Sequence, residues 1–186
     1  HQGTDIGQQL QTASRVGPQQ RAVQGPAPGR AIQLLNKQAQ TTNYHFTDNM
    51  AGFMMSRGEV DAVVVSLKSR TIEPEQACAQ SVTALKWLQA QGAQQIYFKY
   101  CSTFDSTAEG NIGPVTEALM DAIYGAGKGF TIVCPAFPEN NRTIFKGHLF
   151  VGDVLLSDSG MRNHPLTPMT DANLVRVMQS QTQRQV

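Results

Sequence analysis

The stretch VDAVVVSL, at residues 60–67, is a continuous apolar run with three successive valines. Such a run is typical of a strand buried on both faces, as in a parallel sheet covered by helices. Helical spacing of apolar residues follows at residues 75–91, and the aromatic-rich segment QIYFKY follows at residues 95–100. A second helical pattern spans residues 114–124, and FTIVC at residues 130–134 has the composition of a third strand. The order β-α-β-α-β predicts an α/β fold with a parallel sheet and flanking helices.

The pattern changes beyond residue 134. Short apolar stretches separated by glycine-containing turns occupy residues 143–145, 148–151 and 154–156. This pattern predicts a small antiparallel hairpin or meander. A last helix is predicted over residues 172–180, with Asp171 as its N-cap or Thr170 as the alternative.

The first 46 residues differ in composition from the rest of the chain. Residues 1–43 contain ten glutamines together with prolines and glycines, and Asp5 is their only acidic residue. Such a segment has little apolar surface to offset the entropy of ordering it. We expect residues 1–46 to be a flexible or foreign leader, with an interaction tail as the alternative, and residues 47–186 to be the globular part.

Charge and cysteine usage exclude several classes of protein. Fifteen Lys and Arg against fourteen Asp and Glu give a net charge of +1, which does not support a basic surface for nucleic acid or anionic lipid. The sequence has no apolar run long enough to span a membrane. Cys78, Cys101 and Cys134 form neither a disulfide framework nor a CxxC zinc motif, and the histidines lack metal-ligand spacing. We therefore expect a reduced, cytoplasmic chain without a metal site.

Polar clusters follow each predicted parallel strand. In open parallel α/β sheets, ligands bind beyond the carboxyl ends of the strands. The clusters contain cations, hydroxyls, an amide and one acid, and the candidate ligand-binding residues are Lys68, Ser69, Arg70, Lys99, Ser106, Thr107, Asn111 and Arg142, with Asp105 as the candidate catalytic residue. Cationic side chains bind a carboxylate, hydroxyls and an amide sort sugar hydroxyls, and an aspartate accepts a proton from an attacking hydroxyl. These clusters predict a site for a small polyhydroxylated anion.

Other interpretations of these residues stay open. Loops after strands are polar in every α/β protein, and Asp105 or Thr107 could simply cap the following helix. The segment GNIG at residues 110–113 is either a plain loop or a helix start that attracts an anion. The segment GAGKG at residues 125–129 lacks Ser or Thr after its lysine and precedes a predicted strand, so it is not predicted to bind a nucleotide.

Residues 61–182 carry a set of ordered motifs. They are DAVVVSLKSRT (61–71), IYFKYCSTFDSTAEGNIGPV (96–115), CPAFPENNRTIFKGHLFVGDVLL (134–156) and SGMRNHPLTPMTDANLVRV (159–177). The chain thereby resembles the N-terminal domain of the four-carbon acid sugar kinase family, and within it most closely the 3-oxo-tetronate kinase branch. The resemblance implies transfer of the γ-phosphoryl group of ATP, with Mg²⁺, to a sugar acid, which becomes the 4-phosphate in this branch. It also implies that this domain binds the sugar acid and that a separate C-terminal domain binds the nucleotide.

The sequence departs from that family pattern in two places. The family's first strand, which ends in an acidic pair, has no counterpart in residues 1–46, and that pair competes with Asp105 for the role of catalytic base. The chain also ends at Val186, where the family continues into its nucleotide-binding domain, so no ATP site is expected in this chain and it is expected to be inactive alone. The alternatives are a non-catalytic remnant that binds a sugar acid and an unrelated α/β binding module. Loss of strands exposes a sheet edge, which favours pairing with another chain as a homo-oligomer.

Overall fold

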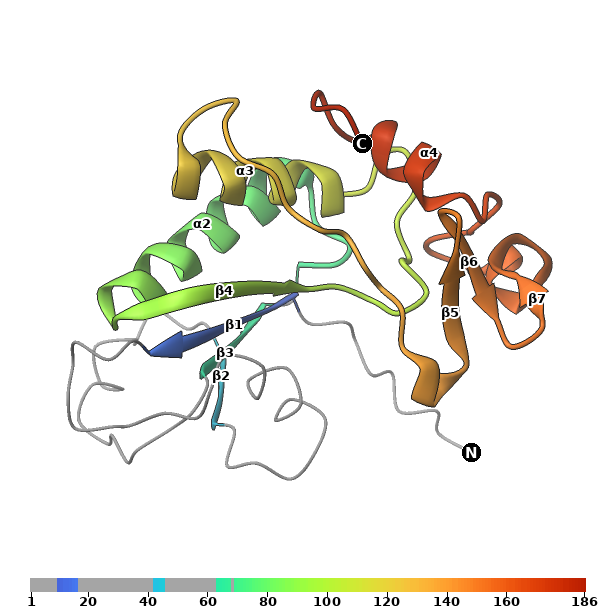
Figure 1. Cartoon of the computed structure of the whole chain (residues 1–186), viewed down its shortest axis with the longest axis horizontal. Helices are drawn as coiled ribbons and strands as arrows, with labels where there is room; N and C mark the ends of the chain where they lie inside the picture. The colour runs from blue at the N-terminus through green and yellow to red at the C-terminus, as the bar shows by residue number, and fades with distance from the viewer. Residues whose placement is uncertain (1–9, 17–41, 46–62, 68) are drawn as a thin grey trace. The chain divides into compact units, whose positions relative to one another are not determined.

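The computed structural model describes residues 10–16, 42–45, 63–67 and 69–186 (Figure 1). The chain divides into two compact units. Of the described residues, one unit contains 69–78 and 100–186, and the other contains 10–16, 42–45, 63–67 and 79–99. Within the described residues, no helix combines the length and the apolar character needed to cross a membrane.

The second unit contains a four-stranded sheet. Its strands are β1 (Leu10–Val16), β2 (Thr42–His45), β3 (Val63–Leu67) and β4 (Ala93–Lys99), in the order β2-β3-β1-β4. Strand β1 lies between β3 and β4 and is antiparallel to both, whereas β2 is parallel to β3 (Figure 1). Strands β3 and β4 overlap the predicted ranges 60–67 and 95–100, and the fold is α/β as predicted. The prediction that the whole sheet is parallel is not confirmed.

Strands β1 and β2 both come from the glutamine-rich tract. The composition of that tract predicts flexibility, and most of it lies outside the described residues, as do the segments 46–62 and residue 68. The domain boundary at residue 46 stays a prediction. What the structure adds is that Leu10–Val16 pairs with two strands at once, with Ala13 opposite Val64 and Tyr97.

Helix α2 (Pro74–Ala90) lies within one residue of the predicted range 75–91 at each end. Proline is favoured in the first turn because its missing N–H has no acceptor there anyway. The fully buried residues recur at helical spacing and form one stripe: Ala77, Ser81, Ala84, Leu85 and Leu88. Gly92 follows the helix with φ 86°, a left-handed conformation that glycine adopts without strain, and its N–H donates to the Gln89 carbonyl over 2.9 Å.

The prediction of a third strand at residues 130–134 is wrong. This segment belongs to no strand, and two of its apolar side chains face solvent, with Phe130 84% and Ile132 83% exposed. Strand propensity is a local property, whereas a strand needs a neighbour that accepts and donates its backbone hydrogen bonds. In the described part of the chain, no such neighbour pairs with residues 130–134.

Helix α3 (Ile112–Tyr124) is the main helix of the other unit. The apolar spacing of Val115, Leu119 and Ile123 predicts one buried face of this helix. Val115 and Leu119 are buried, together with Met120, whereas Ile123 is 38% exposed. The loop of residues 100–111 leads into its first turn. This loop carries the central candidate, Asp105.

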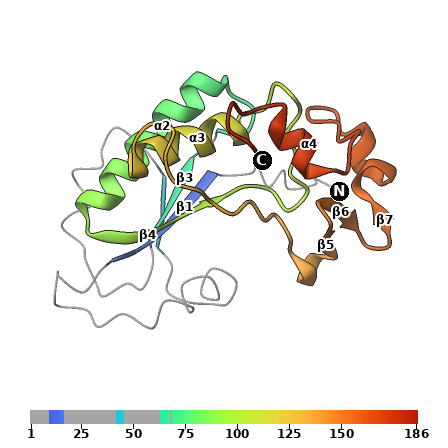
Figure 2. The same ribbon diagram turned by 45° about the horizontal axis from the view of Figure 1, so that its top comes forward.

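The remainder of this unit is a small antiparallel sheet with one short helix. Strands β5 (Arg142–Phe145), β6 (His148–Val151) and β7 (Val154–Leu155) form the predicted meander, preceded by the short turn η2 (Pro138–Asn140). Two further short 3₁₀ turns follow, η3 (Leu156–Asp158) and η4 (Gly160–Asn163). Helix α4 (Leu174–Gln179) lies beside β6 in both views (Figures 1 and 2).

Helix α4 is shorter than predicted, and the prediction of its cap is wrong. Its N-cap is Asn173, whose side chain accepts a hydrogen bond from the Arg176 N–H over 3.1 Å. Asp171 instead accepts the Asn173 N–H and forms an ion pair with Arg176. Asn and Asp cap helices about equally well, so composition alone does not decide between neighbouring positions.

Candidate functional site

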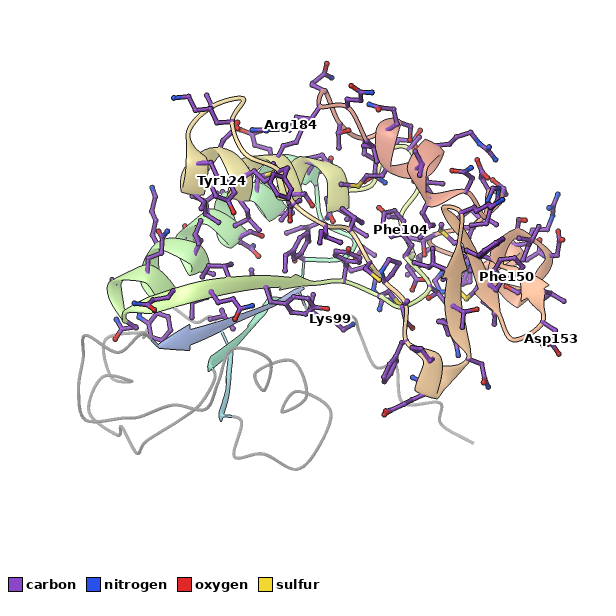
Figure 3. All side chains as sticks on the ribbon, viewed as in Figure 1. Lys99, Phe104, Tyr124, Phe150, Asp153 and Arg184 are labelled. Atoms are coloured by element: carbon purple, nitrogen blue, oxygen red, sulfur yellow. The ribbon has the colours of Figure 1, made fainter. Side chains whose placement is uncertain are left out.

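The backbone of the loop 100–111 is strained at its centre. Phe104 and Asp105 both have positive φ angles, 63° and 39°. Each such residue costs on the order of 1–3 kcal/mol and persists only where the surrounding structure holds the backbone in place. The Phe104 ring is fully buried and packs edge-on against Tyr100, with ring centroids 5.7 Å apart (Figure 3). Burial of this ring stabilises the strained turn, and the turn fixes the backbone conformation of Asp105.

Asp105 is a buried carboxylate with a cationic partner, Arg70. Only 5% of it is exposed, and its two oxygens have different donors. Thr103 Oγ1 donates to Oδ1 over 2.5 Å, and Arg70 Nη1 donates to Oδ2 over 3.1 Å. A buried carboxylate needs such partners because desolvation penalises its charged form. The structure thus brings together two predicted site residues that are 35 positions apart.

Arg70 has one donor, Nε, without a partner among the described residues. This nitrogen is buried. Guanidinium presents five N–H donors in a planar fork that matches carboxylate and phosphate oxygens. An unpaired buried donor beside a carboxylate–arginine pair is suited to an anionic ligand.

Asn111 fixes the segment that carries Arg70. Its Nδ2 donates to the Ser69 carbonyl over 2.7 Å and to the Ile72 carbonyl over 3.1 Å, with the Arg70 carbonyl at 3.4 Å. The amide nitrogen is thereby used within the protein, and only the amide oxygen is left for a ligand. Asn111 also occupies the N-cap position of α3, so neither Asp105 nor Thr107 caps this helix.

The other predicted residues lie in different surroundings. Ser69 and Ser106 are buried, and Thr107 donates through Oγ1 to Glu109 over 3.0 Å. Arg142 starts β5 and donates to the Asn140 carbonyl; no hydrogen bond or ion pair joins it to Arg70 or Asp105 among the described residues. Lys99 ends β4 in the other unit, and Lys68 lies outside the described residues.

Cys101 adds no nucleophile to the site. Its Sγ lies 2.9 Å from Thr103 Oγ1, within the network that reaches Asp105. Burial, and then the nearby Asp105 charge, raise the pKa of the Cys101 thiol above its ordinary value. The thiolate is the reactive form, so this cysteine is held as an unreactive thiol.

Sequence reasoning missed Gln181. Its Oε1 accepts the Gly113 N–H in the first turn of α3 over 2.8 Å, and its Nε2 donates to Ser106 Oγ over 2.8 Å. These partners lie 68 and 75 positions earlier in the chain. No local motif marks such a contact.

The glycine-rich segment 125–129 is not suited to the phosphates of ATP. It follows the C-terminus of α3, the end of a helix that repels phosphate. Its Gly127 N–H already donates to Asp121 Oδ1 over 3.1 Å, and Arg184 binds the Lys128 carbonyl. In the ranges that the structure describes, no three His, Cys, Asp or Glu side chains group as metal ligands.

A comparison with protein families adds to this geometry. A family model described as the sugar-binding N-terminal domain matches residues 6–186. The chain belongs to this family. The 3-oxo-tetronate kinase of Burkholderia multivorans is 69% identical over 128 residues, which are 69% of this chain and 29% of that protein.

Solved structures are also similar, and two of them are informative. A Haemophilus influenzae protein of the DUF1537 family is 52% identical with a TM-score of 0.71, over 78% of this chain and 34% of that one. A Bordetella bronchiseptica DUF1537 domain, crystallised with bound citrate as a domain-swapped dimer, is 25% identical with a TM-score of 0.63, over 80% of this chain and 35% of that one. This chain thus spans about a third of the length of these relatives.

Proposed function

We propose that this chain binds a four-carbon sugar acid, such as 3-oxo-tetronate, at the loop that carries Asp105. The observation that carries the proposal is the Arg70–Asp105 pair: a buried carboxylate and a guanidinium with an unused buried donor, 3.1 Å apart. Membership of the sugar-binding N-terminal domain family supports it. Citrate, which is bound to a relative of this family, is also a small hydroxy acid.

The two side chains have complementary roles in the proposal. Arg70 binds the carboxylate of the sugar acid, because its buried Nε–H has no acceptor among the described residues and a guanidinium matches carboxylate oxygens. Asp105 accepts a hydrogen bond from a sugar hydroxyl and orients it for attack, or removes its proton. Lys68, Lys99 and Arg142 remain further candidates for the carboxylate or for an incoming phosphate.

The proposed role in the longer protein is that of an ATP-dependent kinase that forms the 4-phosphate. The names of the relatives as 3-oxo-tetronate kinases support this role. The glycine-rich segment 125–129 is not suited to the phosphates of ATP, so the nucleotide and its Mg²⁺ are assigned to a separate domain. A non-catalytic sugar-acid-binding module is the second candidate, and the lack of a nucleotide cradle in the described segments favours it for the chain alone.

Location and assembly complete the proposal. A cytoplasmic site of action agrees with the scattered, free cysteines of the described residues. A homo-oligomer is supported by the domain-swapped dimer of the Bordetella bronchiseptica relative. A small-molecule ligand, rather than nucleic acid or a membrane, is the proposed partner.

The test is calorimetric titration of the chain with 3-oxo-tetronate, threonate and erythronate. Asp105→Asn keeps the shape and removes the charge, and Arg70→Gln removes the guanidinium. The matched control is Asp153→Asn, which changes an exposed residue in the turn between β6 and β7, away from Phe104 (Figure 3). We expect binding by the native chain and by Asp153→Asn, and at least tenfold weaker binding by the two site variants. Binding of no four-carbon acid, or equal binding by all variants, would contradict the proposal.

A further inference from the structure

The last residues of the chain form an arm that runs along α3. Residues 180–186, called here the C-terminal arm, follow α4 and contact α3 at Gly113, Glu117 and Asp121. These three positions are four residues apart and so lie on one side of the helix. The backbone N–H groups of Gln183 and Arg184 donate to Glu117 Oε1 over 2.8 and 2.7 Å.

The arm is fixed at its far end by Arg184. Its guanidinium pairs with the Asp121 carboxylate and donates to the Lys128 carbonyl over 2.9 Å, and it lies over α3 in Figure 3. Hydrogen bonds from the Gly127 N–H and then from Arg184 lower the pKa of Asp121 below its ordinary value. The arm is therefore bound along most of α3.

At its near end the arm reaches the candidate site through Gln181. The carboxamide nitrogen donates to Ser106 Oγ over 2.8 Å and also to the Thr107 carbonyl, so both of its hydrogens are used. The carboxamide oxygen accepts the Gly113 N–H. Glycines make room for this contact: a Cβ on Gly113 would lie 2.5 Å from Gln181 Cβ, and a Cβ on Gly110 would lie 2.8 Å from Gln181 Nε2.

This contact fixes the direction of the Ser106 hydroxyl. An amide nitrogen only donates, so Ser106 Oγ accepts in this bond and its own hydrogen points elsewhere. Among the described residues, no acceptor is found for that hydrogen, although only 4% of Ser106 is exposed. A buried donor without an acceptor is unfavourable, and an oxygen of a ligand would satisfy it. Ser106 directly follows Asp105 in the strained loop.

We propose that Gln181 is a positioning residue that presents Ser106 as a hydrogen-bond donor to an acceptor oxygen of the sugar acid. The inference rests on the proposed function, since it assigns part of the same site. It favours ligands whose oxygens at this position only accept, namely a carboxylate or a ketone, over the corresponding sugar alcohols. The C-terminal arm thereby contributes to ligand specificity from outside the loop.

The decisive variant is Gln181→Glu. A glutamate of the same shape accepts from Ser106, so the hydroxyl turns toward it and is lost to the ligand. The matched control is Gln179→Glu, which makes the same change of charge in an exposed side chain whose hydrogen bonds to described residues go to Thr182, Arg184 and Val186. Calorimetry with threonate should give at least tenfold weaker binding for Gln181→Glu, as for one lost hydrogen bond to a charged ligand, and less than threefold for Gln179→Glu.

A double-mutant cycle separates positioning from a purely structural role. Ser106→Ala should weaken binding by a similar factor, and it should add nothing in the Gln181→Glu background, since both changes remove the same donor. Additive losses, or a lower unfolding temperature of Gln181→Glu with unchanged affinity, would overturn the inference. If Gln181→Glu does not fold, Gln181→Met carries the same cycle.

Hydrogen exchange measured without ligand distinguishes a failure of the positioning role of Gln181 from a failure of the proposed function. If the native chain binds no four-carbon acid, the proposed function fails. The positioning role of Gln181 is then tested by the exchange rates of the backbone amides of residues 105–110. We expect faster exchange there in Gln181→Met than in the native chain or in Gln179→Glu. Equal exchange in all three would overturn the positioning role by itself.

Discussion

Replacement of Asn111 by alanine tests how the site is held together. The Asn111 amide links the carbonyls of Ser69 and Ile72 to the start of α3 through bonds of 2.7 and 3.1 Å, and Asn111 is buried. Each lost bond costs about 0.5–1.5 kcal/mol, and leaving buried carbonyls without donors adds to this. We therefore expect Asn111→Ala to lower the free energy of unfolding by about 2–3 kcal/mol, or the melting temperature by about 4–12 °C.

Urea denaturation followed by circular dichroism measures this loss. The matched control is Asn163→Ala, which changes an exposed asparagine in η4 and should alter the free energy of unfolding by less than about 0.5 kcal/mol. Asn111→Ala should also weaken sugar-acid binding, because the segment with Arg70 is released from α3. A loss of stability no larger than that of the control would refute the structural role given to Asn111.

Four further predictions concern activity, packing and pH. In the longer kinase, Asp105→Asn should lower kcat and kcat/KM together by roughly 10²-fold, whereas the present chain alone should show no ATP-dependent phosphorylation above a buffer blank in a coupled assay. Gly113→Ala should destabilise the chain by about 1–3 kcal/mol, because its Cβ would overlap Gln181, while Gly160→Ala, with no atom within 4 Å, should not; equal denaturation midpoints would contradict this. The hydrogen bond from Arg176 lowers the pKa of Asp171, so its stabilisation is present above the ordinary carboxyl pKa of about 4 and is lost as the pH falls through the lower folded value. The difference in stability between the native chain and Asp171→Asn should therefore shrink in acid, and a constant difference would refute the ion pair.

Local sequence signals predicted the helices and the meander well. Proline at the start of α2, glycine after its end and apolar spacing along α3 are properties of the segment itself. The strand at residues 130–134 was predicted wrongly because a strand depends on its neighbour as well as on its own composition. Strand β1 was not predicted, since its sequence LQTASRV lacks the apolar run that marks β3.

The candidate site was predictable only in part. Arg70 and Asp105 follow apolar runs and carry charge, so their sequence positions suggested a common site. The roles of Asn111 and Gln181 depend on backbone carbonyls and N–H groups tens of residues away, which no spacing rule encodes. The left-handed turn at Phe104 and Asp105 was also not predictable, because neither residue requires that conformation.

The most direct test of the central claim is the side-chain NMR signal of Arg70 during titration with a four-carbon sugar acid. Its Nε–Hε group is buried and has no acceptor among the described residues. The signal is assigned by its loss in Arg70→Lys, and Arg162, which is exposed, serves as the internal reference. If Arg70 binds the carboxylate, the Arg70 signal shifts saturably with threonate while the Arg162 signal stays in place. An Arg70 signal that does not move at saturating ligand, or that moves no more than that of Arg162, would contradict the assignment of this site.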